Sequence, residues 1–85
     1  MIKVTRYTAT WCQPCKQLAP LFEQLKTEYP NIMFETIDVD MNKNAAIENG
    51  ITSIPTVIIE KDGVSVNRFQ GVNPKSTYTN VFKSL

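Results

Sequence analysis

The sequence predicts one small α/β domain with four β-strands. Apolar residues alternate near the start of the chain, then recur at steps of three and four, and then alternate again. A strand, a helix and a strand in this order indicate a right-handed parallel βαβ unit. No linker, repeat or low-complexity tract divides the chain, so residues 1–85 are expected to form a single domain with one hydrophobic core.

The first two elements follow from hydrophobic periodicity. A strand is predicted over residues 2–8, where Ile2 and Val4 share one face. The next segment begins at Pro14 and ends before Pro30, and its apolar residues have helical spacing. The apolar stripe consists of Cys15, Leu18, Leu21, Phe22, Leu25 and Tyr29. This pattern predicts an amphipathic helix that packs against the sheet.

The middle of the chain predicts a second strand and a short helix. The strand is expected over Asn31–Asp40, and the helix over residues 42–49. The asparagine that opens this helix is a suitable N-cap, and Gly50 is a suitable end. Ala46 and Ile47 are expected to face inward.

The last third predicts a hairpin and a final helix. A strand over Thr56–Glu60 turns at Lys61-Asp62-Gly63 into a strand over Val64–Phe69. Gln70-Gly71-Val72 breaks the alternation, and Asn73-Pro74 then starts the last helix. The apolar positions of that helix are Tyr78, Val81, Phe82 and Leu85.

Composition and charge exclude several classes of function. Nine scattered Lys and Arg against eight Asp and Glu give a net charge of +1, too little for a nucleic-acid-binding face. No apolar run approaches the ~20 residues of a membrane-spanning helix, and Met1-Ile2-Lys3-Val4 does not resemble an export signal. We therefore expect a cytoplasmic monomer. The absence of His excludes imidazole catalysis and His-ligated metals.

The only two cysteines stand three apart in Cys12-Gln13-Pro14-Cys15, and this spacing admits three interpretations. As a structural disulfide, the pair would close so short a loop that it stabilises the fold by only roughly 2 kcal/mol, and a reducing cytoplasm would keep the two thiols reduced. A structural zinc site needs two more ligands, which only a second chain or carboxylates could supply. A redox-active dithiol is the third interpretation, and the surrounding elements favour it.

The two cysteines occupy different positions on the predicted helix. Cys15 lies in phase with the buried stripe, whereas Cys12 precedes the first turn. Unpaired backbone N–H groups and the helix dipole favour a thiolate at that terminus. A pKa lowered from ~8.5 to near 7 raises the thiolate fraction at neutral pH to roughly half. Cys12 is therefore the candidate nucleophile, and Cys15 is the candidate resolving thiol.

The order of the elements, together with Trp11-Cys12-Gln13-Pro14-Cys15-Lys16 and Ile54-Pro55-Thr56, resembles the thioredoxin family over the whole chain. The resemblance implies the minimal thioredoxin fold, a mixed sheet in the order 2-1-3-4 flanked by three helices. The N-terminal strand and helix of full-length thioredoxins are expected to be missing. The dithiol is expected at the C-terminal end of the first strand.

The same resemblance implies a substrate-binding surface around the dithiol. Pro55 is expected to be cis and to lie opposite the dithiol, where its neighbour's backbone pairs with an extended substrate chain. Gly71 keeps the adjacent surface low enough for a protein substrate, and Trp11 flanks the nucleophile. The residues of this surface are Trp11, Gln13, Pro14, Ile54, Pro55, Gly71 and Val72.

Three residues depart from the family pattern. Gln13 replaces the usual Gly, Arg6 stands where thioredoxins bury an Asp, and Thr36 replaces a Lys that approaches that Asp. Two roles are open for Arg6. It forms a structural ion pair with Glu35 or Asp38, or it lies below the dithiol and lowers a thiol pKa, leaving water or a nearby carboxylate to move the proton.

The function implied by the resemblance is reduction of protein disulfides by dithiol exchange. Cys12 attacks the substrate disulfide, and Cys15 resolves the mixed disulfide. A thioredoxin reductase using NADPH is expected to recharge the protein, and ribonucleotide reductase is an example of a substrate in this family. The chain has no nucleotide-binding motif, so FAD and NADPH belong to the partner and no bound cofactor or metal is expected.

Two alternatives remain open. A glutaredoxin-like protein would use glutathione, but that family usually has a tyrosine inside the dithiol and Thr-Val-Pro at the proline. This chain has Gln13-Pro14 and Ser53-Ile54-Pro55 instead. A non-catalytic binding module would use an apolar patch of Trp11, Ile54, Gly71 and Val72, and it would keep its function after both cysteines were replaced.

Overall fold

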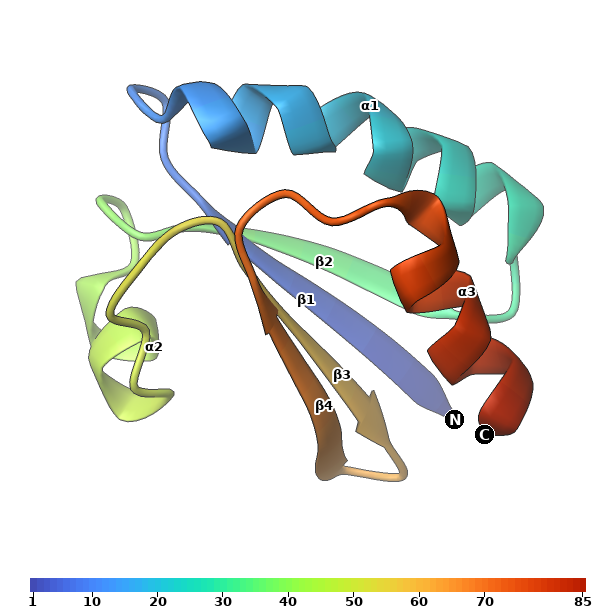
Figure 1. Ribbon diagram of the computed structural model, residues 1–85. Helices are drawn as coiled ribbons and strands as arrows, with labels where there is room; N and C mark the ends of the chain where they lie inside the picture. Colours follow the sequence, from blue (N-terminus) through green and yellow to red (C-terminus); the bar gives the residue numbers. More distant parts are fainter.

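The computed structural model describes residues 1–85 and contains the predicted mixed sheet with three helices (Figure 1). The strand order is β2-β1-β3-β4. β1 pairs in parallel with β2 and antiparallel with β3, and β3 pairs antiparallel with β4. The elements are β1 (Ile2–Thr8), α1 (Gln13–Glu28), β2 (Met33–Asp38), α2 (Lys43–Glu48), β3 (Thr56–Lys61), β4 (Val64–Gln70) and α3 (Lys75–Ser84).

The hydrophobic core lies between one face of the sheet and the helices α1 and α3 (Figure 1). Full burial of a Leu, Ile or Phe side chain stabilises a fold by roughly 1.5–3 kcal/mol, so this layer is the main source of stability. Aromatic rings from both helices meet edge to face in the core, as in the pair of Phe22 and Tyr78. The buried residues of the cluster are Val4, Leu18, Phe22, Leu25, Val57, Ile59, Tyr78 and Phe82.

The helix α1 forms where the periodicity predicts it. Its buried residues Cys15, Leu18, Phe22 and Leu25 recur at steps of three and four. Cys12 is the N-cap, because its sulfur accepts a hydrogen bond from the backbone N–H of Cys15 at 3.3 Å. A proline in the first turn needs no intrahelical N–H partner and fits there.

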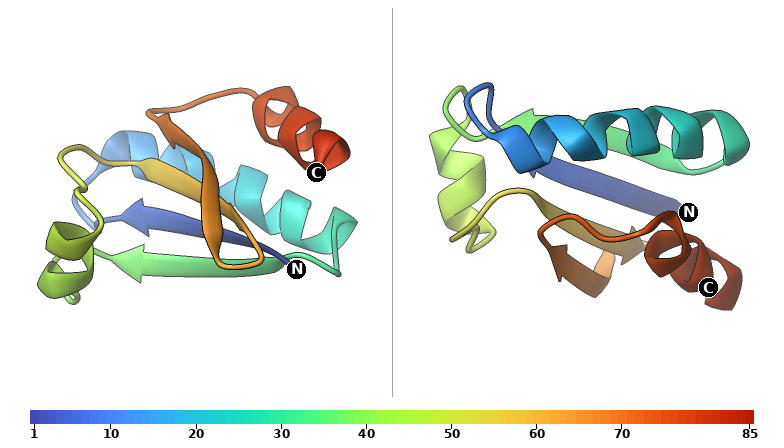
Figure 2. Two further views of the ribbon diagram at one scale, coloured as in Figure 1. Left: turned by 90° about the horizontal axis from the view of Figure 1, so that it is seen from below. Right: turned by 45° about the horizontal axis from the view of Figure 1, so that its top comes forward.

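The opposite face of the sheet carries polar side chains. Lys3 and Glu35 form an ion pair at 3.0 Å across β1 and β2. Thr5, Tyr7 and Ile58 are nevertheless buried. α2 lies on this side, beyond the carboxyl ends of β1 and β2 (Figure 2). None of the three helices combines the length and the hydrophobicity that a transmembrane segment needs.

The segment around α2 differs from the sequence prediction. β2 is shorter than Asn31–Asp40, because the chain after Asp38 leaves the sheet and turns towards α2. The inward position predicted for Ile47 is wrong: its side chain is 75% exposed, whereas Ala46 is buried. A helix of only six residues presents one position to the domain, and Ala46 takes it. Asn42 is the N-cap by position, but its side chain does not cap the helix.

The hairpin of β3 and β4 brings the chain back to the dithiol end of the sheet. Its turn contains Asp62 and Gly63, both with positive φ, as the predicted turn at these residues requires. After β4, the backbone N–H of Gly71 donates to the carbonyl of Pro55 at 2.9 Å. This bond fixes the loop before α3 beside the start of β3, which is next to the first turn of α1.

Candidate functional site

The two cysteines lie where the carboxyl end of β1 leads into α1, and they are joined by a disulfide with a Cα separation of 5.3 Å. The loop between the two elements is tight, because the N–H of Cys12 donates back to the carbonyl of Ala9 at 3.2 Å. Cys15 is 1% exposed, and Cys12 is 5% exposed. In the reduced state, the N–H of Cys15 and the helix dipole would both stabilise a thiolate on Cys12.

The segment of Ile54 and Pro55 faces this disulfide. The peptide bond between them is cis, as the resemblance implied. The sulfur of Cys12 lies 3.9 Å from the carbonyl oxygen of Ile54. A chain bonded to Cys12 would therefore pass directly along the backbone of Ile54. Gly71, held to Pro55 by its N–H, borders the same surface.

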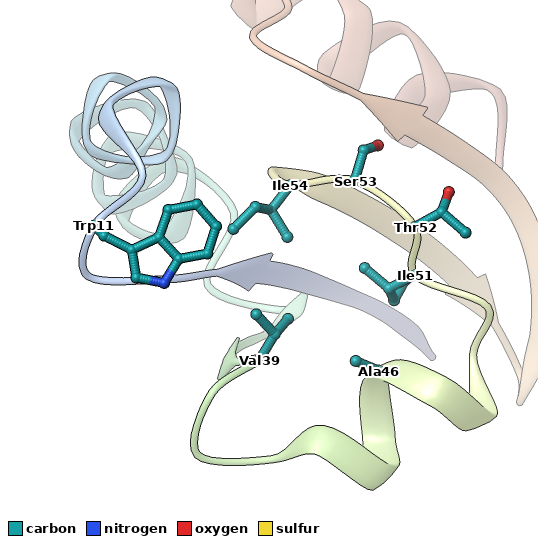
Figure 3. Close-up of a pocket in the computed structure, with 7 residues that line it drawn as sticks. All are labelled: Trp11, Val39, Ala46, Ile51, Thr52, Ser53 and Ile54. Atoms are coloured by element: carbon teal, nitrogen blue, oxygen red, sulfur yellow. The ribbon is translucent and has the colours of Figure 1, made fainter.

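An apolar cavity of about 410 Å³ adjoins the dithiol (Figure 3). The side chain of Ile54 points towards the ring of Trp11, and Val39, Ala46 and Ile51 point inward from α2 and the adjoining loops. The indole of Trp11 is 67% exposed, but its Nε1 donates to Asp40 Oδ2 at 2.7 Å. The rim of the cavity formed by Trp11 is thus exposed to solvent.

The structure brings together most of the surface that the resemblance implied. Trp11, Ile54, Pro55 and Gly71 surround the disulfide, and Gln13 and Pro14 are exposed at the start of α1. Val72 is 49% exposed beside Gly71.

Sequence reasoning missed Val39 and Ala46 as lining residues of the cavity, and Asp40 as the hydrogen-bond partner of Trp11. The carboxyl ends of parallel β1 and β2 meet at one edge, so the position of Asp40 just after β2 was a usable signal.

Arg6 is buried below the dithiol and forms neither of the ion pairs considered from the sequence. Glu35 pairs with Lys3, and the ion pairs of the structure do not include Arg6. The guanidinium donates to Thr36 Oγ1 at 3.3 Å and lies 5.5 Å from the ring centre of Phe22. Burial lowers its pKa, and the charge of Glu23 opposes that effect. The prediction of a structural ion pair is therefore wrong, because α1 and Thr36 enclose the guanidinium.

A second cavity, of about 230 Å³, lies beneath the disulfide. Arg6 and Cys15 both border it. Its lining residues are Arg6, Thr8, Ala9, Thr10, Cys15, Lys16, Ala19 and Asp38. No three or more His, Cys, Asp or Glu side chains gather in a group that could hold a metal ion.

A redox-active disulfide at a helix N-terminus, faced by a cis proline on this mixed sheet, defines a thiol-disulfide oxidoreductase. The family model for thioredoxin matches residues 2–84. The chain belongs to the thioredoxin family.

Individual relatives support this assignment. A thioredoxin of Aspergillus fumigatus is 45% identical over 69 residues, which cover 79% of this chain and 63% of that protein. A thioredoxin of Staphylococcus epidermidis is 38% identical over 81 residues, covering 94% of this chain and 78% of that one. The crystal structure of oxidised mitochondrial thioredoxin 3 from Saccharomyces cerevisiae superimposes with a TM-score of 0.90 at 33% identity, covering 99% of this chain and 78% of that one.

Proposed function

We propose that the protein reduces disulfide bonds of other proteins, with Cys12 as the nucleophile and Cys15 as the resolving thiol. The observation that carries this proposal is the position of Cys12. Its sulfur is the N-cap of α1 and lies 3.9 Å from the backbone of Ile54, next to the cis peptide bond. The helix supplies the electrostatic stabilisation that a thiolate needs, and the facing backbone supplies a place for the substrate chain.

The exchange proceeds in two steps. The thiolate of Cys12 attacks one sulfur of the substrate disulfide, a mixed disulfide forms, and the other substrate sulfur leaves as a thiolate. Cys15 then loses its proton and attacks Cys12, which re-forms the internal disulfide and releases the second substrate thiolate. Two electrons pass from the protein to the substrate, and the protein is left in the disulfide form seen in the structure.

The substrate surface proposed here consists of Trp11, Gln13, Pro14, Ile54, Pro55, Gly71 and Val72. An extended chain attached to Cys12 would align with the backbone at Ile54, as in strand addition. A side chain next to the substrate cysteine would enter the apolar cavity between Trp11 and Ile54. Because this cavity is lined mainly by apolar groups, we expect substrates with an apolar residue beside the reacting cysteine to be favoured.

The oxidised protein needs an electron donor to act again. A reductase that carries its own FAD and NADPH is the proposed donor, and no cofactor is assigned to this chain. The cycle requires a compartment in which thiols are kept reduced, so the proposed location is the cytoplasm. We propose a monomer, since the surface around Cys12 must remain free for a protein substrate.

Reduction of insulin disulfides tests this function. The protein is assayed with NADPH and a thioredoxin reductase, and in parallel with glutathione and glutathione reductase. Activity with the first donor only is expected, whereas activity with glutathione only would assign a glutaredoxin function. Cys12→Ser should abolish turnover, and Cys15→Ser should accumulate the mixed disulfide. If wild type instead bound a protein partner without reducing it, and the variant with both cysteines replaced bound that partner equally well, the protein would be a binding module.

A further inference from the structure

The cavity beneath the disulfide opens to the resolving cysteine and not to the nucleophile. Cys15 is among its lining residues, whereas Cys12 is not. The cavity is also separate from the apolar one, since the two have no residue in common. Cys15 is otherwise enclosed, with 1% of its surface exposed. The cavity therefore places room for water beside Cys15, apart from the apolar cavity next to Trp11 and Ile54.

The charged groups of this cavity come from three elements. β1 contributes Arg6, α1 contributes Lys16, and Asp38 is the last residue of β2. Glu23 of α1 also acts on Arg6. Asp38 is the only carboxylate among the lining residues, and the other polar side chains besides Cys15 are hydroxyls or cations.

Asp38 is held in place by the backbone that follows it. Its Oδ1 accepts hydrogen bonds from the N–H of Asp40 at 2.8 Å and of Met41 at 3.3 Å. Its Oδ2 has no hydrogen-bond donor from the protein. The carboxylate is therefore fixed at the cavity with one oxygen available to water.

Arg6 is a buried cation without a counter-ion. It is 9% exposed, its Nε has no hydrogen-bond partner, and its Nη2 is bonded only to the neutral hydroxyl of Thr36. Burying an unpaired charge is costly. An anion formed at Cys15 during the second step of exchange would lie on the same cavity and would supply the missing negative charge.

We propose that Asp38 accepts the proton of Cys15 through water in this cavity, while Arg6 stabilises the thiolate left behind. The inference rests on the proposed function and specifies its second step. The proton leaves the Cys15 sulfur for water, and Asp38 takes a proton from that water. The Cys15 electron pair forms the bond to Cys12, the bond from Cys12 to the substrate breaks, and the substrate sulfur leaves as a thiolate. Asp38 later returns its proton to solvent.

The test follows the two steps separately with one reagent. Reduced protein is mixed in a stopped-flow instrument with excess dipyridyl disulfide, which is uncharged and releases a coloured thiopyridone at each step. The first release reports attack by Cys12, and the second reports attack by Cys15 on the mixed disulfide. Both rates are measured as a function of pH. If the first release did not occur, the proposed function would be contradicted. If the first release is normal, a change in the second release tests the inference alone.

Two variants and two matched controls are compared. Asp38→Asn removes the base but keeps an oxygen that can accept the N–H bonds of Asp40 and Met41, so the turn is retained. Arg6→Met removes the charge and keeps an apolar stem of similar length. Glu48→Gln and Lys26→Met make the same charge changes at exposed positions outside the cavity.

We expect Asp38→Asn to slow the second release by about tenfold or more at neutral pH, with the first release unchanged. Its second rate should then rise steeply with pH, because solvent hydroxide must take the proton. Arg6→Met should shift the midpoint of the second-release profile upward by about one pH unit. If both variants gave the second-release rates and pH profiles of Glu48→Gln and Lys26→Met, the inference would be overturned.

Discussion

Trp11 and Asp40 join the two segments that border the apolar cavity: the indole Nε1 donates to the carboxylate Oδ2 at 2.7 Å. Trp11 precedes the nucleophilic cysteine, and Asp40 follows β2. Trp11 is 67% exposed, and this bond restrains rotation of its ring. The orientation of the proposed substrate surface therefore depends on a carboxylate from a different element.

Replacing Asp40 with Ala should release the indole. A hydrogen bond to a charged group contributes about 1.5 kcal/mol, so we expect KM for insulin to rise by roughly tenfold with little change in kcat. Trp11 is the only tryptophan, and its fluorescence anisotropy should fall as the ring gains nanosecond motion. Asp40→Asn retains an oxygen acceptor and serves as the control. Equal KM values for Asp40→Ala and wild type would refute a positioning role.

Replacing Gly71 with Ala is expected to lower the stability of the fold and to weaken substrate binding. Its φ of +78° is unfavourable for any residue with a Cβ, so Gly71→Ala should destabilise the fold by about 1–2 kcal/mol. A Cβ there meets no atom within 4 Å, so the added methyl group would project into the space left for the substrate. We therefore also expect a higher KM for insulin.

Gly50→Ala is the matched control for this prediction. Gly50 has a φ of +62° and equally open surroundings, but it follows α2. Denaturant unfolding should show a similar loss of stability for both variants, and only Gly71→Ala should change KM. A rise in KM for both would mean that destabilisation, not the substrate surface, is responsible.

The elements with long hydrophobic patterns could be predicted from the sequence alone. α1 has four buried residues at helical spacing, and the hairpin has a turn signal at Asp62 and Gly63, so both were located closely. α2 offers no such pattern, since it has six residues and buries only Ala46. In so short a helix, the apolar character of Ile47 does not show whether its side chain points towards the domain or towards solvent.

The site was predictable only in part, for a similar reason. The positions of Cys12 and Cys15 on the helix follow from local spacing. The partners of Arg6 do not, because they depend on how α1 packs over β1. Arg6 alternates with Ile2 and Val4 along β1, but Thr36 and Phe22 lie beside it only in the assembled fold. The contact of Trp11 with Asp40 likewise requires two loop ends to meet.

The buried charge of Arg6 is expected to lower the free energy of unfolding. Replacing a buried, uncompensated charge with an apolar side chain of similar volume commonly stabilises a protein by about 1–4 kcal/mol. Arg6→Met should therefore raise the free energy of unfolding, and in a domain of this size each kcal/mol raises Tm by roughly 4–8 °C. Lys26→Met, at an exposed position, should change stability by less than about 0.5 kcal/mol. A destabilised Arg6→Met would show that the contacts with Thr36 and Phe22 outweigh the burial cost.

The burial of the Tyr78 hydroxyl predicts that the protein loses stability at high pH. Its side chain is fully buried in the core, and burial is the main cause that raises the pKa of its hydroxyl above the ordinary value of 10.0. Between pH 10 and the higher folded pKa, the unfolded chain loses a proton that the folded chain keeps. The unfolded state is therefore favoured progressively as pH rises, whereas below pH 10 the stabilisation is fully present.

Tyr78→Phe should weaken this alkaline dependence. The hydroxyl has no hydrogen bond of good geometry, and Asn73 is the one residue whose polar groups act on it, so its removal should change stability at neutral pH by no more than about 1 kcal/mol. Urea unfolding at neutral pH and above pH 10 measures both effects. The control is Tyr29→Phe, which removes a hydroxyl from a half-buried ring that packs against Phe82. Tyr7 has a raised pKa for the same main reason, so part of the dependence should persist in Tyr78→Phe. An unchanged slope in Tyr78→Phe would mean that the Tyr78 hydroxyl ionises equally easily in the folded and unfolded chains.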